Sequence, residues 1–167
     1  MVVTMNESEK KSKLFAVIRI RGRTSLSPDI ERTLELLKLT RKNHMALVRE
    51  TPSTQGMLQK VKDFVTWGEI SIETLERVLE KRGLLVGNKR LTNDYLKEST
   101  PFKNVKELAK MIYNGKVELK HLKFMKPIFR LTPPSGGFKG SIKKSFKTKG
   151  ELGYRGEAIN ELILKMI

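Results

Sequence analysis

The chain has 167 residues and a strongly basic composition, with 34 Lys and Arg against 18 Asp and Glu and a formal net charge of +16. Its longest apolar run, Leu14–Ile18, is far shorter than the roughly 20 residues of a membrane-spanning helix, and no signal-peptide pattern opens the sequence. The sequence contains no cysteine, which excludes disulfides, thiolate metal sites and a thiol nucleophile. These features predict a basic cytoplasmic protein whose partner is a polyanion.

The first predicted elements alternate between strand and helix. Alternating apolar residues predict a strand over Leu14–Gly22, in which arginines replace apolar residues on one face toward the end. A helix within residues 25–39 begins at Ser27, a good capping residue followed by proline and aspartate. A second strand is predicted over His44–Glu50.

The second predicted helix starts at Ser53 or Thr54 and keeps Val65 on its buried face. A third helix follows from Ser71 to about Arg82, where a glycine stops it. The β-α-β-α order with short connections favours helices on one face of a sheet.

The second half of the chain is more irregular. Residues 83–96 look like a turn-rich loop, and Asn104 caps a helix over Val105–Tyr113. Met125–Leu131 is predicted to be a strand, and its proline suggests an edge or strand-start position. A closing helix follows Gly156.

Positive charge is concentrated between Leu119 and Gly150, where nine Lys and Arg occur and no carboxylate. Such a cluster opposes a compact state by self-repulsion, whereas phosphates would neutralise it and release counterions. A solvated basic loop that serves only solubility is the alternative. Because residues 133–150 lack apolar periodicity, we expect them to be poorly ordered alone and shaped by a partner.

No catalytic or nucleotide motif is complete. The only Gly-Lys pair, Gly115–Lys116, is followed by valine instead of the Ser or Thr of a phosphate loop. The glycines of Gly150–Gly156 lack the dinucleotide spacing, and the helices that flank a KH clamp are missing. His44 and His121 favour structural or RNA-facing roles, so the sequence predicts no enzyme, no metal and no cofactor.

Three segments instead combine cations with permissive backbone. Arg19–Arg23 (RIRGR) offers guanidinium groups for phosphates or bases, although an exposed strand end with solvated arginines is the alternative. Glu50–Gly68 contains a helix N-terminus suited to a phosphate, and Pro133–Lys147 interleaves glycine, lysine and phenylalanine. Together they favour contact with irregular or unstacked RNA.

Taken in order, six pieces of the sequence resemble the L-thirty family of large-subunit ribosomal proteins in its archaeal form, whose eukaryotic relatives are called L-seven. The pieces are FAVIRIRGR, SPDIERTLELLKL, ETPSTQGMLQKVKDFVTWGEI, KRGLLVGNKRLTNDYLKE, PPSGGFKG and GELGYRGEAINELI. The resemblance runs from about Leu14 to the C-terminus. Residues 1–13 have no counterpart, and Met5 is an alternative start residue.

The resemblance implies an α+β fold with a ferredoxin-like β-α-β-α-β core, a helical insertion and a basic C-terminal extension. It also implies a structural role in the large ribosomal subunit, with ribosomal RNA, nearby 5S RNA and neighbouring ribosomal proteins as partners. The expected organisation is a polar tail at 1–13, a core at 14–70, a helical insertion at 71–124, a third core strand at 125–131, and a basic loop with a C-terminal helix at 132–167.

Carried over by position, the resemblance also implies a set of RNA-contacting residues spread over the chain. They are Arg19, Arg21, Arg23, Ser53, Gln55, Gly56, Lys60, Lys62, Lys81, Arg82, Asn88, Lys89, Arg90, Gly137, Phe138, Lys139, Lys143, Lys144 and Tyr154.

Other classes of protein remain as alternatives. A non-ribosomal RNA-processing or chaperone module fits the charge distribution equally well. A DNA-binding protein would use the helix at 71–82 as its recognition element. This helix is poorly suited to that role, because its glutamates would face the phosphates of DNA. A small hydrolase is the last alternative, although the sequence shows no combination of a nucleophile and a base that such an enzyme would need.

Overall fold

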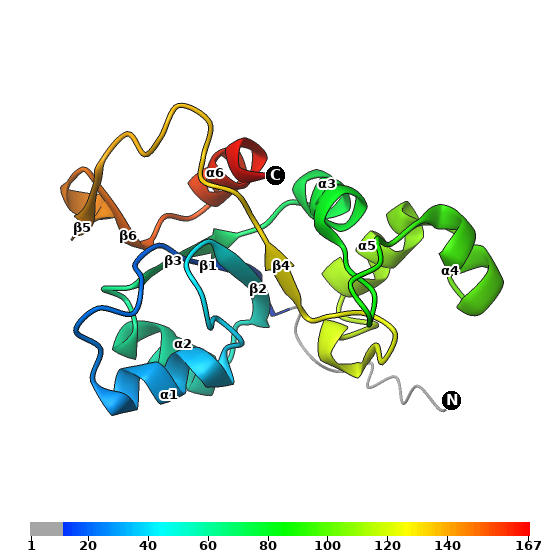
Figure 1. Cartoon of the computed structure of the whole chain (residues 1–167), viewed down its shortest axis with the longest axis horizontal. Helices are drawn as coiled ribbons and strands as arrows, with labels where there is room; N and C mark the ends of the chain where they lie inside the picture. The colour runs from blue at the N-terminus through cyan, green and yellow to red at the C-terminus, as the bar shows by residue number, and fades with distance from the viewer. Residues whose placement is uncertain (1–11) are drawn as a thin grey trace.

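The computed structural model describes residues 12–167 and shows a six-stranded mixed sheet with helices on both faces (Figure 1). The predicted tail, residues 1–13, lies outside the described residues except for its last two. The elements are β1 (Leu14–Arg19), α1 (Pro28–Leu36), β2 (His44–Arg49), α2 (Pro52–Lys60), β3 (Val65–Glu69), α3 (Ile72–Arg82), α4 (Asn93–Ser99), α5 (Val105–Tyr113), the 3₁₀ turn η1 (Leu119–His121), β4 (Ile128–Arg130), β5 (Ser141–Ser145), the 3₁₀ turn η2 (Phe146–Thr148), β6 (Gly150–Tyr154) and α6 (Ala158–Met166).

The strand order is β4-β2-β1-β3-β6-β5, and β1 lies between antiparallel neighbours on both sides. Every residue of β1 is buried, and its apolar side chains, Leu14 to Ile18, alternate between two separate apolar clusters. Phe15 and Val17 pack with α1 and α2, whereas Ala16 and Ile18 pack with α3, α5 and α6. The α+β fold and the ferredoxin-like core agree with the prediction, and α1 and α2 share one face as expected.

The third strand of the core is not the predicted one. Val65–Glu69 forms β3 and pairs with β1, so the β-α-β-α-β unit closes before residue 70. The prediction of 125–131 as third core strand is wrong, since β4 pairs only with β2 at the far edge of the sheet. Its edge position, expected from Pro127, is confirmed.

The pattern around β3 explains this error. Val65 continues the helical spacing of Val61, so the sequence pattern predicts that it belongs to the second helix. Four successive residues from Val65 to Gly68 are buried, so β3 lacks the polar alternation that marks a strand with one solvent face. Gly68 is required here, because a Cβ at this position would lie 1.9 Å from the carbonyl oxygen of Gly156.

Helix starts follow the predicted capping chemistry with one correction. Ser27, Ser71 and Asn104 cap α1, α3 and α5 as expected. The cap of α2 is Thr51 instead of Ser53 or Thr54, and Thr51 and Thr54 form a reciprocal capping box.

The insertion is more helical than predicted. Residues 83–96, expected to be a loop, contain a bridge between Leu84 and Arg90 followed by the start of α4. Thr92 caps α4 through the N–H of Tyr95. Leu96 of α4 is fully buried in the same cluster as the apolar face of α5, which gives the short helix its tertiary support.

The C-terminal extension is also more regular than the sequence suggested. Within the segment 133–150, β5 forms and pairs in parallel with β6, with a register shift, while β6 pairs with β3. The closing helix α6 buries its four predicted apolar residues, Ile159, Leu162, Ile163 and Met166. The basic segment is therefore attached at both of its ends to packed structure.

Candidate RNA interface

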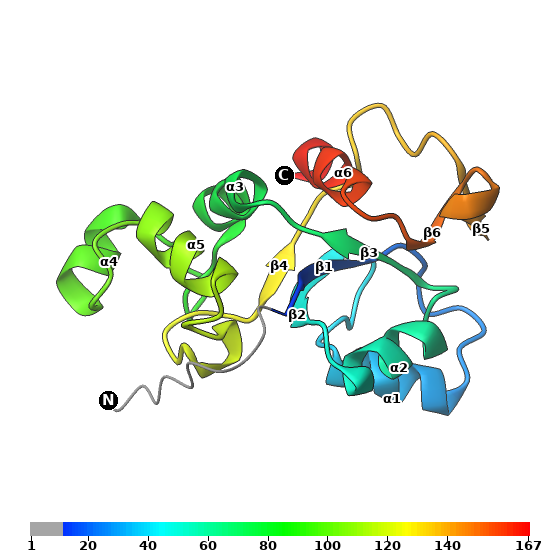
Figure 2. The same cartoon turned by 180° about the vertical axis from the view of Figure 1, so that it is seen from behind.

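The RNA-contacting residues expected from the resemblance fall into groups at separate parts of the molecule. Arg21 and Arg23 follow β1, a second group lies on α2, a third lies around the end of α3 and the loop 84–91, and a fourth lies on the C-terminal extension. Figures 1 and 2 place the extension and the α4 end of the insertion at opposite ends of the long axis. The structure does not bring the four groups into one cleft, which suits an extended RNA surface.

Arg19 does not belong to a contact surface. Arg19 is only 2% exposed, and its guanidinium donates to the carbonyl oxygens of Leu39 at 2.8 Å and Arg21 at 2.9 Å. Burial lowers the pKa of Arg19, and the nearby charge of Arg23 lowers it further. The expectation that Arg19 contacts RNA is therefore wrong, because its side chain holds the loops after β1 and α1 together.

The other two arginines of the RIRGR motif remain accessible. Arg21 is half-buried with its guanidinium over the ring of Phe64, 5.2 Å from the ring centre. Arg23 is exposed, and within residues 12–167 its side chain makes only a long contact of 3.4 Å to the carbonyl oxygen of Thr40. An exposed guanidinium with few internal hydrogen bonds can donate to phosphate oxygens.

The α2 group is exposed, but its helix N-terminus is less open than expected. The N–H of Thr54 is taken by the side chain of Thr51, so the capping box competes with a phosphate. Gln55 donates to Glu50 at 2.8 Å, and Lys60 pairs with Asp29 at 2.5 Å. The remaining members of this group, Ser53, Gly56 and Lys62, are exposed.

The insertion group surrounds the turn that joins α3 to α4. Lys81, Lys89 and Arg90 are exposed, and Arg82 is half-buried. Asn88 takes a left-handed conformation at φ 64 and accepts a hydrogen bond from Lys126 at 2.5 Å, which ties the turn to the segment before β4. This contact gives Asn88 a structural role in shaping the turn.

The extension group contains the densest exposed charge. Lys139, Lys143 and Lys144 are exposed, as are the further lysines Lys147 and Lys149, which the resemblance did not single out. Gly137 is exposed with φ 76, and Phe138 is half-buried.

Tyr154, at the end of β6, is partly committed to the fold. Its hydroxyl donates to Glu69 at 2.5 Å, and its ring packs edge-on against Phe15 and tilted against Trp67. The hydrogen bond to Glu69 raises the pKa of Tyr154 to about 12, with burial as the second cause. Burial alone would raise the pKa of Glu69, but the hydrogen bonds from Tyr154 and Lys13 outweigh it and lower that pKa.

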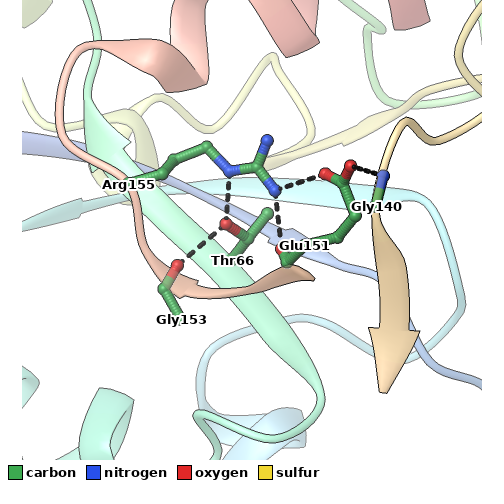
Figure 3. Close-up of polar contacts among 5 residues, drawn as sticks. All are labelled: Thr66, Gly140, Glu151, Gly153 and Arg155. Carbon is green, nitrogen blue, oxygen red and sulfur yellow. Dashed lines mark hydrogen bonds and ion pairs between the residues drawn. The ribbon is translucent and has the colours of Figure 1, made fainter. Parts of the chain in front are cut away.

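A buried polar network anchors the extension to the core (Figure 3). Arg155 donates to Thr66 of β3 at 2.7 Å and to the side chain and carbonyl oxygen of Glu151 at 2.8 and 2.6 Å. Glu151 accepts from the N–H of Gly140 at 2.8 Å, and Thr66 donates to the carbonyl oxygen of Gly153 at 2.8 Å. The network therefore joins β3, the residue before β5, and β6.

Sequence reasoning missed this network. Glu151 and Arg155 are four residues apart, but they lie at a strand and its end, where no helical spacing brings such residues together. The one indication in the sequence is Glu151, a carboxylate directly after the long basic segment.

The two histidines offer no catalytic arrangement. His44 is buried at the start of β2, and burial followed by the charges of Arg130, Arg41 and Arg19 lowers its pKa. His121 is exposed beside Glu118. Among residues 12–167 no three His, Asp or Glu side chains lie close enough together to hold a metal ion. None of the helices in this part of the chain is long and apolar enough to cross a membrane.

Comparison with known proteins identifies the family. The family model for ribosomal protein L30p/L7e matches residues 15–65. The large ribosomal subunit protein uL30 of Hyperthermus butylicus is 50% identical over 170 residues, covering 96% of this chain and 94% of that protein. The uL30 proteins of Staphylothermus marinus and Nanoarchaeum equitans are 50% and 51% identical, each covering 92% of this chain and 98% and 99% of their own length. The resemblance seen in the sequence is confirmed, and the chain belongs to the L30p/L7e family of ribosomal proteins.

Proposed function

We propose that this chain is a structural constituent of the large ribosomal subunit and binds and stabilises ribosomal RNA there, in the cytoplasm. The observation that carries the proposal is the segment 139–149, with five exposed lysines and no carboxylate, held on the sheet by a buried network. The names of the archaeal relatives support the same role.

The mechanism follows from the division between core and extension. The two-faced sheet holds the basic groups in fixed relative positions, so that RNA elements bound to different groups are tied together. The lysines supply affinity through phosphates without reading sequence. Specificity comes from RNA shape and from a few contacts of aromatic side chains or backbone to unstacked bases.

The finer points of the proposal concern the partners and the lack of catalysis. Neighbouring ribosomal proteins are further partners, and 5S RNA lies close to the bound chain. The protein acts without a cofactor and without a reaction of its own, a proposal that rests on the lack of a complete catalytic motif in the sequence.

Sucrose-gradient fractionation of a native lysate in moderate and in high salt, probed for this chain, tests the proposal. We expect almost all of the chain to sediment with the large subunit in both salts. A free pool, or loss from the subunit at moderate salt, would contradict it and favour an auxiliary RNA-binding factor.

A further inference from the structure

A cavity lies between residues 137–155 of the C-terminal extension and its closing helix α6. Its volume is about 350 Å³, at the lower end of the roughly 300–1,000 Å³ typical of small-ligand sites. Two phenyl rings, Phe138 and Phe146, and the backbone of three glycines line it, together with the buried residues Glu151 and Arg155. A cavity of this size and lining fits one planar ring system better than a folded peptide.

Phe146 provides a fixed platform in this cavity. The guanidinium of Arg155 lies over the ring of Phe146, 5.0 Å from the ring centre, and Phe146 itself remains 40% exposed. Arg155 is in turn held by Thr66 and Glu151, so that the stacked pair is rigid before any ligand binds. A preorganised ring loses little conformational entropy when a second ring stacks on it.

Arg155 has one donor group left for a ligand. Its side chain is only 5% exposed, and Nε and Nη2 are engaged with Thr66 and Glu151. Nη1 donates no hydrogen bond to any residue that the structure describes, and it points away from both partners (Figure 3). An acceptor oxygen of a ligand would satisfy this nitrogen.

Cations surround the opening. Lys139 and Lys165 both pair with the exposed carboxylate of Glu161, at 3.7 and 3.3 Å. Lys149 has no carboxylate partner within residues 12–167. With three lysines against the single carboxylate of Glu161, the rim of the cavity favours a ligand whose ring is attached to a phosphate.

We propose that this cavity takes a single unstacked base of the bound RNA, an inference that rests on the proposed function and deepens it. The base stacks on the face of the Phe146 ring that Arg155 leaves open, Arg155 Nη1 donates to an oxygen of the adjoining sugar-phosphate backbone, and Lys149 binds a phosphate next to it. Stacking on an aromatic side chain and a salt-dependent phosphate contact are the usual combination for unpaired RNA.

Two RNA-like probes of equal charge test the inference on the full chain. One is an octamer of uridylate, and the other is an octamer with the same sugar-phosphate backbone and no bases. Fluorescence anisotropy at about 0.1 M salt should show that the uridylate octamer binds at least about five-fold tighter, as expected for one stacked base.

Variants of Phe146 locate the effect. Phe146→Leu should remove the advantage of the uridylate octamer and leave the affinity for the abasic octamer unchanged. Phe146→Trp should keep the advantage, because the larger ring still stacks. Tyr113→Leu, which removes an exposed ring from the distant α5, is the matched control and should behave like the natural chain. Thermal unfolding of each variant checks that the extension stays folded.

Equal binding of the two octamers by the natural chain would overturn the inference, as would a loss for Phe146→Leu that is the same for both. Neither result bears on sedimentation with the large subunit, so failure of the cavity and failure of the ribosomal role are distinguishable.

Discussion

β1 and β5 are strands of one sheet, yet they are stabilised in different ways. All six residues of β1 are buried, and both of its faces are covered by helices. In β5 only Ile142 is half-buried, and the other four residues are exposed. β1 is fixed by apolar packing on two sides, whereas β5 depends on backbone pairing with β6 and on the network of Arg155 and Glu151.

This difference separates stability from binding. The core contains most of the buried apolar side chains, whereas the lysines of the segment 139–149 are all exposed. Removing an exposed cation should therefore weaken RNA binding and spare stability, whereas removing a buried polar group should lower stability. The following predictions test that separation, beginning with the largest expected effect.

Arg155→Met should cause the largest loss of stability. It leaves the carboxylate of Glu151 buried without its charged partner, and breaking a buried pair in this way costs about 3–5 kcal/mol. Hydrogen exchange should show that the amides of β5 and β6 lose protection while those of β1 keep it. Arg23→Met, at an exposed arginine, is the matched control, with a change within about 0.5 kcal/mol. Simultaneous loss of protection in β1 and β5 would contradict two separately stabilised regions.

Arg19→Met should come next, with a loss of about 1–3 kcal/mol in the free energy of unfolding. The side chain donates hydrogen bonds to the carbonyl oxygens of Leu39 and Arg21, and these groups lose a charged donor. Urea denaturation measures the loss, and RNA titration should show an unchanged salt dependence. Arg23→Ala should do the reverse, with unchanged stability and a salt slope reduced by about 0.7–0.9. A reduced salt slope for Arg19→Met would return this residue to the RNA interface.

How far the sequence allows these regions to be predicted depends on the pattern that each presents. β1 and α6 were predictable from their apolar periodicity, and α3 from its apolar periodicity together with its capping residue Ser71. β3 was not, because a strand buried on both faces has no alternation and continues the spacing of the preceding helix. α4 was also missed, since Thr92 and a single buried residue, Leu96, are a weak signal in a segment with turn residues.

The candidate interface divides in the same way. The basic extension was predictable from charge alone, and the lysines of β5 are exposed as charge requires. The burial of Arg19 was not predictable, because it depends on carbonyl groups of a distant loop that only the fold brings near. The strand β5 was not predictable for the same reason, since the anchor of this segment joins Thr66 to Arg155 across 89 positions of sequence.

Lys143→Ala combined with Lys144→Ala should weaken RNA binding by about tenfold, or about 1.4 kcal/mol, without changing stability. Both side chains are exposed, and no ion pair or side-chain hydrogen bond of either occurs in the part of the chain that the structure describes. The slope of binding against salt should fall by about 1.4–1.8 if each lysine contacts one phosphate. An unchanged slope would remove β5 from the phosphate-binding surface.

Tyr154→Phe should have the smallest effect, since it removes one partly exposed hydrogen bond between β6 and β3 and costs about 1 kcal/mol or less. The consequence appears at high pH. Because the folded pKa of Tyr154 is raised to about 12, above an unfolded value near 10, the folded state binds this proton more tightly. The stability from the bond to Glu69 is therefore fully present below pH 10 and is lost as pH rises toward 12.

Urea denaturation between pH 9 and 12 measures this loss. Lysines also titrate in this range, so the informative quantity is the difference in unfolding free energy between the natural chain and Tyr154→Phe, which cancels their common contribution. That difference should shrink as the pH approaches 12. A difference that stays constant would mean that the hydroxyl of Tyr154 does not hold its proton against Glu69, and that packing against Phe15 and Trp67 alone joins the extension to the core at this point.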